Sequence, residues 1–133
     1  MTGVSELVLE VHDLEAAECF YTEALGLPVV ERWGEREATW LMAGEQTRIG
    51  LWRQFVGLAG ARGGAHVHFA LHLPEPDYDA AIDRMRQHGY EPEEHLFDAY
   101  DGSRAAYVTD PAGNVVELWT WDVARHLERT PRP

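Results

Sequence analysis

The stretch GGAHVHFALHLP, residues 63–74, alternates between imidazole and apolar side chains. The histidines occupy the even positions and apolar residues occupy the odd positions between them: His66, His68 and His72, with Val67, Phe69, Leu71 and Leu73. Successive side chains of a β-strand point to opposite faces. The stretch therefore predicts a strand with one face packed on a core and the other turned towards solvent or a site.

The composition bounds the class of protein. The chain has 133 residues, 45% of them apolar, which suffices for the core of one domain. No apolar run approaches the roughly 18 residues that span a bilayer, and the acidic N-terminal end lacks the basic start and apolar stretch of a signal peptide. We therefore expect a cytoplasmic protein with no membrane partner.

The charged residues and the cysteine count exclude several kinds of chemistry. The formal net charge of −12 disfavours nucleic acid as a partner, because phosphates need clustered cations. All 11 basic residues are arginine, so no lysine can form a Schiff base, and no phosphate-binding loop ending in Gly-Lys-Ser/Thr is present. Cys19, the sole cysteine, cannot form an internal disulfide, and its helical surroundings favour a packed thiol over a nucleophile.

The order of expected elements repeats along the chain. Residues 6–12 alternate as a strand, Asp13 can cap a helix that ends near Gly26, and strand-like runs follow at 28–33, 36–43 and 47–54. The order recurs with a strand at 66–73, a helix at 77–88 and strands at 91–98, 103–109 and 114–121. We predict one α+β domain over residues 1–133: a first βαβββ module at 5–54, a linker at 55–65, a second module at 66–122 and a C-terminal tail at 123–133.

Alternation along these strands assigns polar and aromatic side chains to one surface. If each module curls its strands around a hollow, with its helix on the outside, the face opposite the helix lines that hollow, which we call the cup. The cup then receives Glu6, Glu10 and His12 from the first strand, Arg48 and Trp52 from the fourth, His66 and His68 from the fifth, and Glu117, Trp119 and Trp121 from the last. The tryptophan rings offer a large contact area to an aromatic ligand.

Three carboxylates in such a cup repel one another unless something offsets their charge. The repeat pairs Glu6 with His66 and Gly50 with Glu117. A divalent ion held by Glu6, His66 and Glu117 would offset the carboxylates, and these donors suit Zn, Mn, Ni, Co or Fe. Two alternatives stay open: Arg48 and the neighbouring histidines neutralise the carboxylates, or water fills the cup.

Other ring-bearing residues have ordinary structural explanations. We expect His88, His95 and His126 on the surface, and Trp33 and Trp40 in the core or in an interface. His12 adjoins the predicted helix cap at Asp13, so it can be a turn residue as well as a ligand-binding one.

Three segments together resemble the vicinal oxygen chelate (VOC) superfamily, also called the glyoxalase, bleomycin resistance protein and dioxygenase superfamily. They are LVLEVHDLEAAECFYTEALGL near the start, HVHFAL at the opening of the second module, and YVTDPAGNVVEL near the end. The resemblance covers residues 5–122. It implies two βαβββ modules that form a cupped, mostly antiparallel eight-strand sheet, paired in a homodimer.

The resemblance also implies where a metal ion would bind. In metal-dependent members the ligands lie at the start of the first strand, at the start of the fifth and in the last, which here are Glu6, His66 and Glu117. Glu6 departs from the usual His or Gln. Gly50 stands where lyases and epimerases carry a fourth ligand, so the resemblance favours a three-ligand site like that of ring-cleaving dioxygenases or fosfomycin-modifying enzymes.

Two functions remain as hypotheses, both with a small-molecule ligand or substrate. In the first, a divalent ion held in the cup polarises a substrate oxygen, and His68, Glu10 or Arg48 moves protons or steadies the developing anion. In the second, a metal-free resistance protein sequesters a planar or cationic antibiotic among the tryptophans and acidic walls of a dimer cleft. The resemblance further implies that each cup is completed by a second copy of the chain.

Overall fold

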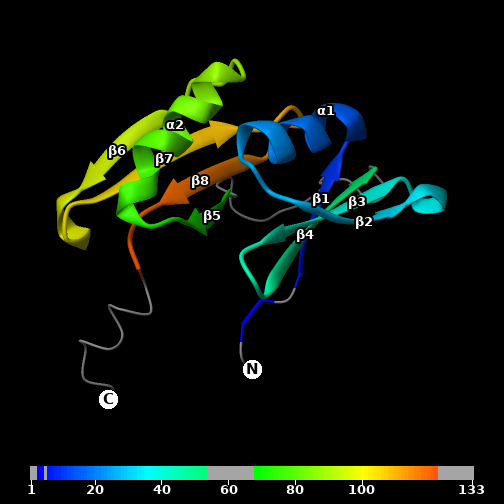
Figure 1. Ribbon diagram of the computed structural model, residues 1–133, viewed down its shortest axis with the longest axis horizontal. Helices are drawn as coiled ribbons and strands as arrows, with labels where there is room; N and C mark the ends of the chain where they lie inside the picture. Colours follow the sequence, from blue (N-terminus) through cyan, green and yellow to red (C-terminus); the bar gives the residue numbers. More distant parts are fainter. Residues whose placement is uncertain (1–2, 5, 54–67, 123–133) are drawn as a thin grey trace, which may run out of the picture.

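Each half of the chain folds in the order strand, helix, three strands, as the sequence predicts (Figure 1). The computed structural model describes residues 3–4, 6–53 and 68–122, so the predicted linker and tail lie outside the described residues. The first module consists of β1 (Glu6–Val11), α1 (Leu14–Cys19) continued by the π-helical turn η1 (Phe20–Ala24), β2 (Val29–Trp33), the 3₁₀ turn η2 (Gly34–Arg36), β3 (Ala38–Ala43) and β4 (Thr47–Arg53). The second consists of β5 (His68–His72), the 3₁₀ turn η3 (Glu75–Asp77), α2 (Tyr78–Gln87), β6 (Glu93–Phe97), the 3₁₀ turn η4 (Asp98–Tyr100), β7 (Ser103–Thr109) and β8 (Val115–Trp119).

The eight strands are divided between two four-stranded sheets with matching topology. Sheet A has the order β1-β4-β3-β2 and sheet B the order β5-β8-β7-β6. In each sheet the first strand pairs in parallel with the last, and the remaining pairs are antiparallel. The fold is therefore α+β with two mixed sheets, and the two helices lie beside each other on one side of both (Figure 1).

The local sequence explains the first helix. The Asp13 side chain accepts a hydrogen bond from the Ala16 amide at 3.0 Å, which satisfies one of the free donors at the helix start. Ala17, Phe20, Tyr21 and Ala24 are buried on the face that meets the sheets. Gly26 has a φ of +75°, a left-handed conformation that ends the helix at low cost in strain.

One apolar core joins the two modules. It contains residues from α1 and η1, from α2 and from the helix-facing sides of both sheets: Val11, Ala17, Phe20, Tyr21, Ala24, Leu41, Ile49, Leu51, Tyr78, Ile82, Met85, Ala106, Val108, Val116 and Leu118. Phe20 of the first module meets Tyr90 of the second edge-to-face at 4.7 Å between ring centroids. No tryptophan belongs to this core cluster.

The predicted alternation of β5 is confirmed. Phe69 and Leu71 pack against the core, whereas His68, Ala70 and His72 are exposed on the other side. The same holds in β1, where Leu9 and Val11 contribute to the core and Glu6 and Val8 are exposed. We call the side of each sheet that points away from the helices its cup face.

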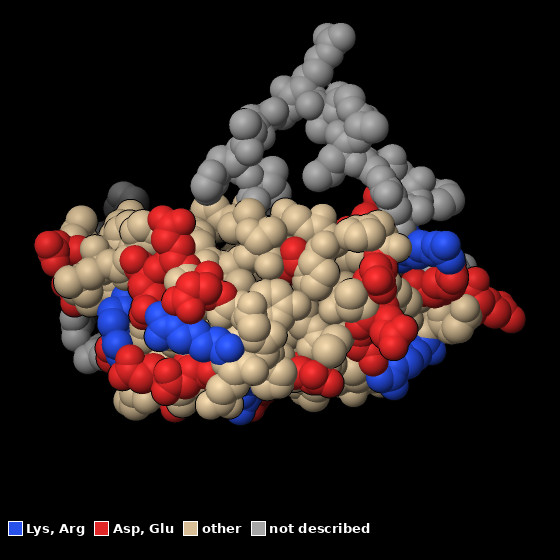
Figure 2. Space-filling model, turned by 90° about the horizontal axis from the view of Figure 1, so that it is seen from above, with Lys and Arg blue, Asp and Glu red and all other residues tan. Residues whose placement is uncertain are grey.

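Charge is spread unevenly over the outside of the molecule. Figure 2 shows the face above the helices, where acidic side chains gather mainly towards the two ends, with arginines among them and uncharged residues between. Within the described residues no helix is both long enough and apolar enough to cross a bilayer.

A buried hydrogen bond fastens the two modules together. The Tyr21 hydroxyl donates to Oδ2 of Asp110 at 2.9 Å, and both residues are at most 4% exposed. Burial, followed by the negative charge of Asp110, raises the pKa of Tyr21, so the phenol keeps its proton and remains a donor. Asp110 also accepts from the backbone of Ala112 and from the backbone and side chain of Asn114.

We predict that Tyr21→Phe lowers the free energy of unfolding by about 1–3 kcal/mol, because a buried carboxylate then loses one of its donors. Urea unfolding followed by circular dichroism measures the change. Tyr100→Phe is the matched control, since Tyr100 is 42% exposed. An equal effect of both substitutions would contradict the structural role of the Tyr21 hydrogen bond.

Candidate functional site

The cup face of sheet A carries three tryptophans in mutual contact. Trp40 on β3 is 1% exposed and lies beneath the half-buried rings of Trp33 and Trp52. The ring centroids are 5.2 Å apart for Trp33 and Trp40, 5.7 Å for Trp33 and Trp52, and 6.0 Å for Trp40 and Trp52, all edge-to-face. The sequence predicted Trp33 and Trp40 in the core or an interface. Trp40 is buried, although outside the main core cluster, and Trp33 is half-buried.

Gly50 leaves room for two of these rings. A Cβ atom at position 50 would lie 2.7 Å from Trp40 Cζ3 and 2.8 Å from Trp52 Nε1, well inside van der Waals contact. The position at which the resemblance implies a possible fourth metal ligand is therefore filled by indole rings.

Arg48 joins three polar or aromatic groups on the same face. Its Nε donates to Oε1 of Glu6 at 2.7 Å, its Nη2 also contacts Glu6, and its Nη1 lies 3.4 Å from Oε2 of Glu31. Its guanidinium carbon lies 3.9 Å from the ring centroid of Trp40, a cation–π contact. The predicted neutralisation of a cup carboxylate by Arg48 is thus observed for Glu6.

The cup face of sheet B centres on a buried carboxylate. Glu117 on β8 is 2% exposed, and its Oε2 lies 3.1 Å from Nε2 of His68 on β5. Tyr107, its neighbour across the β7–β8 pair, has a pKa raised by burial first and then by a hydrogen bond to Glu117 and the charge of that group. Tyr107 therefore stays protonated and can donate to the carboxylate.

Aromatic rings extend this face on both sides of Glu117. One cluster joins the rings of Phe97, Tyr100, Trp119 and Trp121, with neighbouring centroids 5.1–6.3 Å apart. On the other side lies an open cavity of about 540 Å³, lined by Glu93, His95, Phe97, Tyr107, Thr109 and Val115. His95 is exposed, as the sequence predicted. Its ring centroid lies 5.6 Å from that of Tyr107, and its Nε2 lies 2.9 Å from Oε1 of Glu93.

The strand registers correct one pairing inferred from the repeat. Val8 pairs with Gly50 in the first module, and Ala70 pairs with Glu117 in the second. If Gly50 and Glu117 correspond, the residue that corresponds to Glu6 is His68, not His66. The sequence pairing is two residues too early because His66 and His68 have the same position in the strand alternation. The alternation alone therefore cannot tell which of them corresponds to Glu6.

The remaining predicted site residues lie as follows. His66 lies outside the described residues. Glu10 is half-buried beside Trp52 in the register of β1 with β4. His12 is exposed next to the helix cap, and Trp121 is half-buried just after β8.

Two residues on the cup faces, Glu31 and Tyr107, were not predicted as site residues. Each is identified only by its contact with a residue of another strand, which is Arg48 for Glu31 and Glu117 for Tyr107. The alternation of β2 and β7 could have placed them on the cup face, had their register been known.

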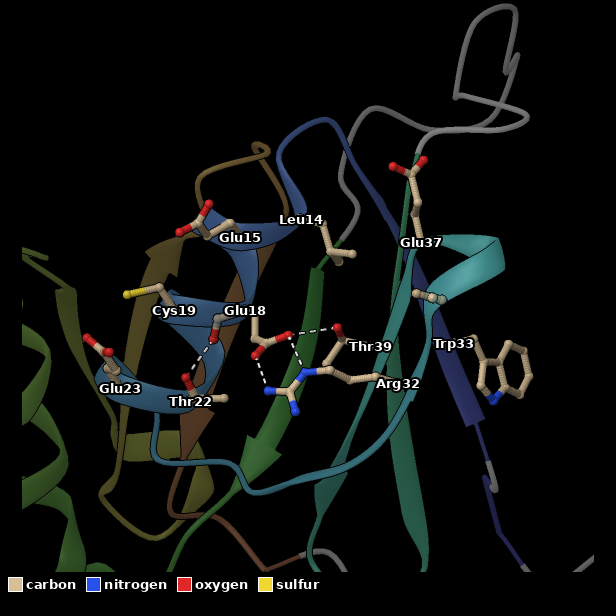
Figure 3. Close-up of a pocket in the computed structure, with 12 residues that line it drawn as sticks. Leu14, Glu15, Glu18, Cys19, Thr22, Glu23, Arg32, Trp33, Glu37 and Thr39 are labelled. Carbon is tan, nitrogen blue, oxygen red and sulfur yellow. Dashed lines mark hydrogen bonds and ion pairs between the residues drawn. The ribbon is translucent and has the colours of Figure 1, made fainter.

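A second pocket lies on the flank of the first module. It has a volume of about 580 Å³ and is lined by α1, η1, β2 and the start of β3, with Glu18 held by Arg32 and by the Thr39 hydroxyl at 2.7 Å (Figure 3). Cys19 at its edge is exposed rather than packed as the sequence suggested. A hydrogen bond to Glu23, followed by desolvation and the charges of Glu23 and Glu15, raises the pKa of the Cys19 thiol, which makes it a poor nucleophile.

The donor set of the described residues does not fit a three-ligand metal centre. His68 and Glu117 supply one nitrogen and one carboxylate side by side, but Glu6 is neutralised by Arg48 on the other sheet. Among the residues that the structure describes, no group of three or more His, Cys, Asp and Glu side chains could hold an ion.

We predict that Gly50→Ala destabilises the protein by about 1–3 kcal/mol, because the new methyl group displaces the rings of Trp40 and Trp52. The tryptophan emission maximum should shift as well. Gly34→Ala is the matched control: nothing lies within 4 Å of a Cβ there, so its effect should stay within about 0.5 kcal/mol. Wild-type stability and emission in Gly50→Ala would contradict the packing described.

Known proteins share the sequence pattern and the fold of this chain. The chain matches the model of the Glyoxalase/Bleomycin resistance protein/Dioxygenase superfamily over residues 3–118. No curated protein gives a significant match. Among solved structures, the antibiotic-binding protein TnmS3 from Streptomyces sp. CB03234 is 25% identical, with 92% of this chain and 98% of that chain covered and a TM-score of 0.70.

Two further structures share the fold at lower identity. A variant of the fosfomycin resistance protein FosX from Listeria monocytogenes, in complex with Mn(II), is 18% identical, with 97% and 98% of the two chains covered and a TM-score of 0.74. Lactoylglutathione lyase from Agrobacterium tumefaciens is 23% identical, with 90% and 94% covered and a TM-score of 0.70. Because the family model matches residues 3–118, the chain belongs to the glyoxalase/bleomycin resistance protein/dioxygenase superfamily.

Proposed function

We propose that this protein binds a flat, aromatic small molecule between the rings of its cup faces and holds it without chemical turnover. One observation carries the proposal: all five tryptophans of the chain belong to the aromatic clusters of the cup faces, and none belongs to the core beneath the helices. Four of the five rings are half-buried rather than fully covered, so they present apolar surface for stacking.

The indole nitrogens support a ligand that carries acceptor atoms. The Nε1 donors of Trp40, Trp52 and Trp119 are buried and have no hydrogen-bond partner among the described residues. A buried donor without an acceptor costs about 1–3 kcal/mol, so such groups call for an explanation. A small shift of the rings would expose some of these donors. Carbonyl, hydroxyl or ring-nitrogen atoms of a bound molecule would then accept hydrogen bonds from them.

The similarity to TnmS3 also supports the binding of a small molecule without turnover. TnmS3 is an antibiotic-binding protein and has higher identity to this chain than FosX or the lactoylglutathione lyase. An antibiotic of planar shape is accordingly the ligand class that we propose, with resistance by sequestration as its consequence.

The His68–Glu117 pair favours a second candidate, a divalent-metal-dependent enzyme. These two side chains offer an imidazole and a carboxylate at 3.1 Å, and the FosX variant is a relative whose structure contains Mn(II). Glu6 or His66 would have to complete the site, with Glu10 or Arg48 as candidate groups for acid–base or anion-stabilising work. Stoichiometric metal in untagged protein purified without chelator would favour this candidate.

We also propose that the chain forms a homodimer whose cups are closed by the partner copy. The exposed Val8 on the cup face of sheet A, 45% accessible in the single chain, supports such a cover. Sedimentation equilibrium measures the association state directly.

Acridine, an uncharged three-ring heterocycle, is a suitable probe of the proposed binding. We predict saturable quenching of tryptophan emission by acridine in metal-free protein. Trp52→Ala and Trp119→Ala should each weaken binding roughly fivefold, since one lost ring contact is worth about 1 kcal/mol.

The control for this titration is Glu18→Gln, which changes the flank pocket and leaves both cup faces intact. Its affinity for acridine should equal that of the wild type. A loss of affinity in Glu18→Gln with none in Trp52→Ala and Trp119→Ala would move the ligand to the flank pocket and overturn the proposal.

A further inference from the structure

Arg48 is held in place by groups from three different strands. Glu6 comes from β1, Trp40 from β3 and Glu31 from β2, and all three contact the one guanidinium group of β4. Its side chain is 31% exposed, against 45% for Glu6 and 48% for Glu31. Arg48 is therefore the most covered of the three charged side chains, with the Trp40 ring beneath it and carboxylates beside it.

The contacts use the carboxylates in different ways. Oε1 of Glu6 accepts from two nitrogens of Arg48, whereas Glu31 accepts from Arg48 through Oε2 and from the Trp33 indole through Oε1 at 2.5 Å. A guanidinium group stays protonated over the whole physiological pH range. The positive charge that Arg48 brings to these two carboxylates therefore does not depend on pH within this range or on a bound ion.

A divalent ion at the same place would meet two obstacles. The Arg48 charge would repel it, and the carboxylate of Glu6 would have to give up its guanidinium partner. Removal of the guanidinium ends the repulsion and frees the carboxylate of Glu6. Glu6 and Glu31 each lie within contact distance of the position that the guanidinium leaves. Two carboxylates around one position are the kind of oxygen donors that hard divalent cations prefer.

We propose that Arg48 is the resident cation of the cup and the residue that decides whether sheet A accepts a metal ion: the wild-type face excludes divalent ions, and loss of the guanidinium converts it into a metal-binding face. The inference rests on the proposed function, since a cup whose carboxylates already have a cationic partner can hold an uncharged planar ligand without a metal. It also gives Glu6 the role of anchoring Arg48 over Trp40.

The test is the affinity for Mn²⁺, measured by electron paramagnetic resonance of the free ion. Arg48→Met should bind Mn²⁺ on the order of tenfold more tightly than the wild type or better, because two carboxylates are released. The double variant Glu6→Gln, Arg48→Met should lose most of this gain. Glu6→Gln alone should leave Mn²⁺ binding at the wild-type level.

Arg53→Met provides the matched control on the same strand. Arg53 contacts both oxygens of Glu37 at 2.6 Å, so this variant also removes a guanidinium from a carboxylate, but from one carboxylate only. It should gain no Mn²⁺ affinity. Arg48→Gln, which also removes the cation, replaces Arg48→Met if the latter does not fold, with the same expected gain.

Two results would overturn the inference: wild-type protein that holds stoichiometric metal lost on Glu6→Gln, or a folded Arg48 variant whose Mn²⁺ affinity equals that of the wild type. Both are independent of acridine binding, which is measured on metal-free protein. If the wild type binds acridine but also binds a metal through Glu6, this inference alone fails. If Arg48→Met gains Mn²⁺ binding but acridine does not bind, the inference stands and the proposed function fails.

Discussion

The alternation of side chains across a strand is the constraint on which this structure depends. Each sheet must give one face to the shared core, and the residues that satisfy this demand in β1, β4, β5 and β8 are aliphatic or aromatic without exception: Leu9, Val11, Ile49, Leu51, Phe69, Leu71, Val116 and Leu118. Every second residue is thereby turned to the opposite face, whatever its chemistry. The indoles, the histidines and the buried Glu117 occupy that face because the core has no place for them.

Charged groups on the cup faces are paired within each sheet. On sheet A Arg48 contacts two glutamates and lies over Trp40, and on sheet B Glu117 lies against His68 and Tyr107. These contacts join strands of the same sheet, so each half of the site is built by its own module. The same packing explains Gly50, because the two indoles that cover it leave no space for a side chain.

Much of this arrangement could be predicted from periodicity alone. The order of elements, the cap at Asp13, the end of the first helix near Gly26 and the two faces of β5 follow from local rules and are confirmed. The site was harder to predict because its contacts join strands far apart in the chain. Glu6 meets Arg48 across 42 positions, and the choice between His66 and His68 required the register of β5 with β8, which no local pattern contains.

The proposal that the cup faces form the binding surface is tested most directly by two-dimensional NMR of the five indole N–H groups during an acridine titration. We expect the signals of Trp52 and Trp119 to shift progressively and saturate, while the backbone amides of Glu18, Cys19 and Thr22 at the flank pocket stay unchanged. Unmoved indole signals together with shifted amides at the flank pocket would contradict this proposal.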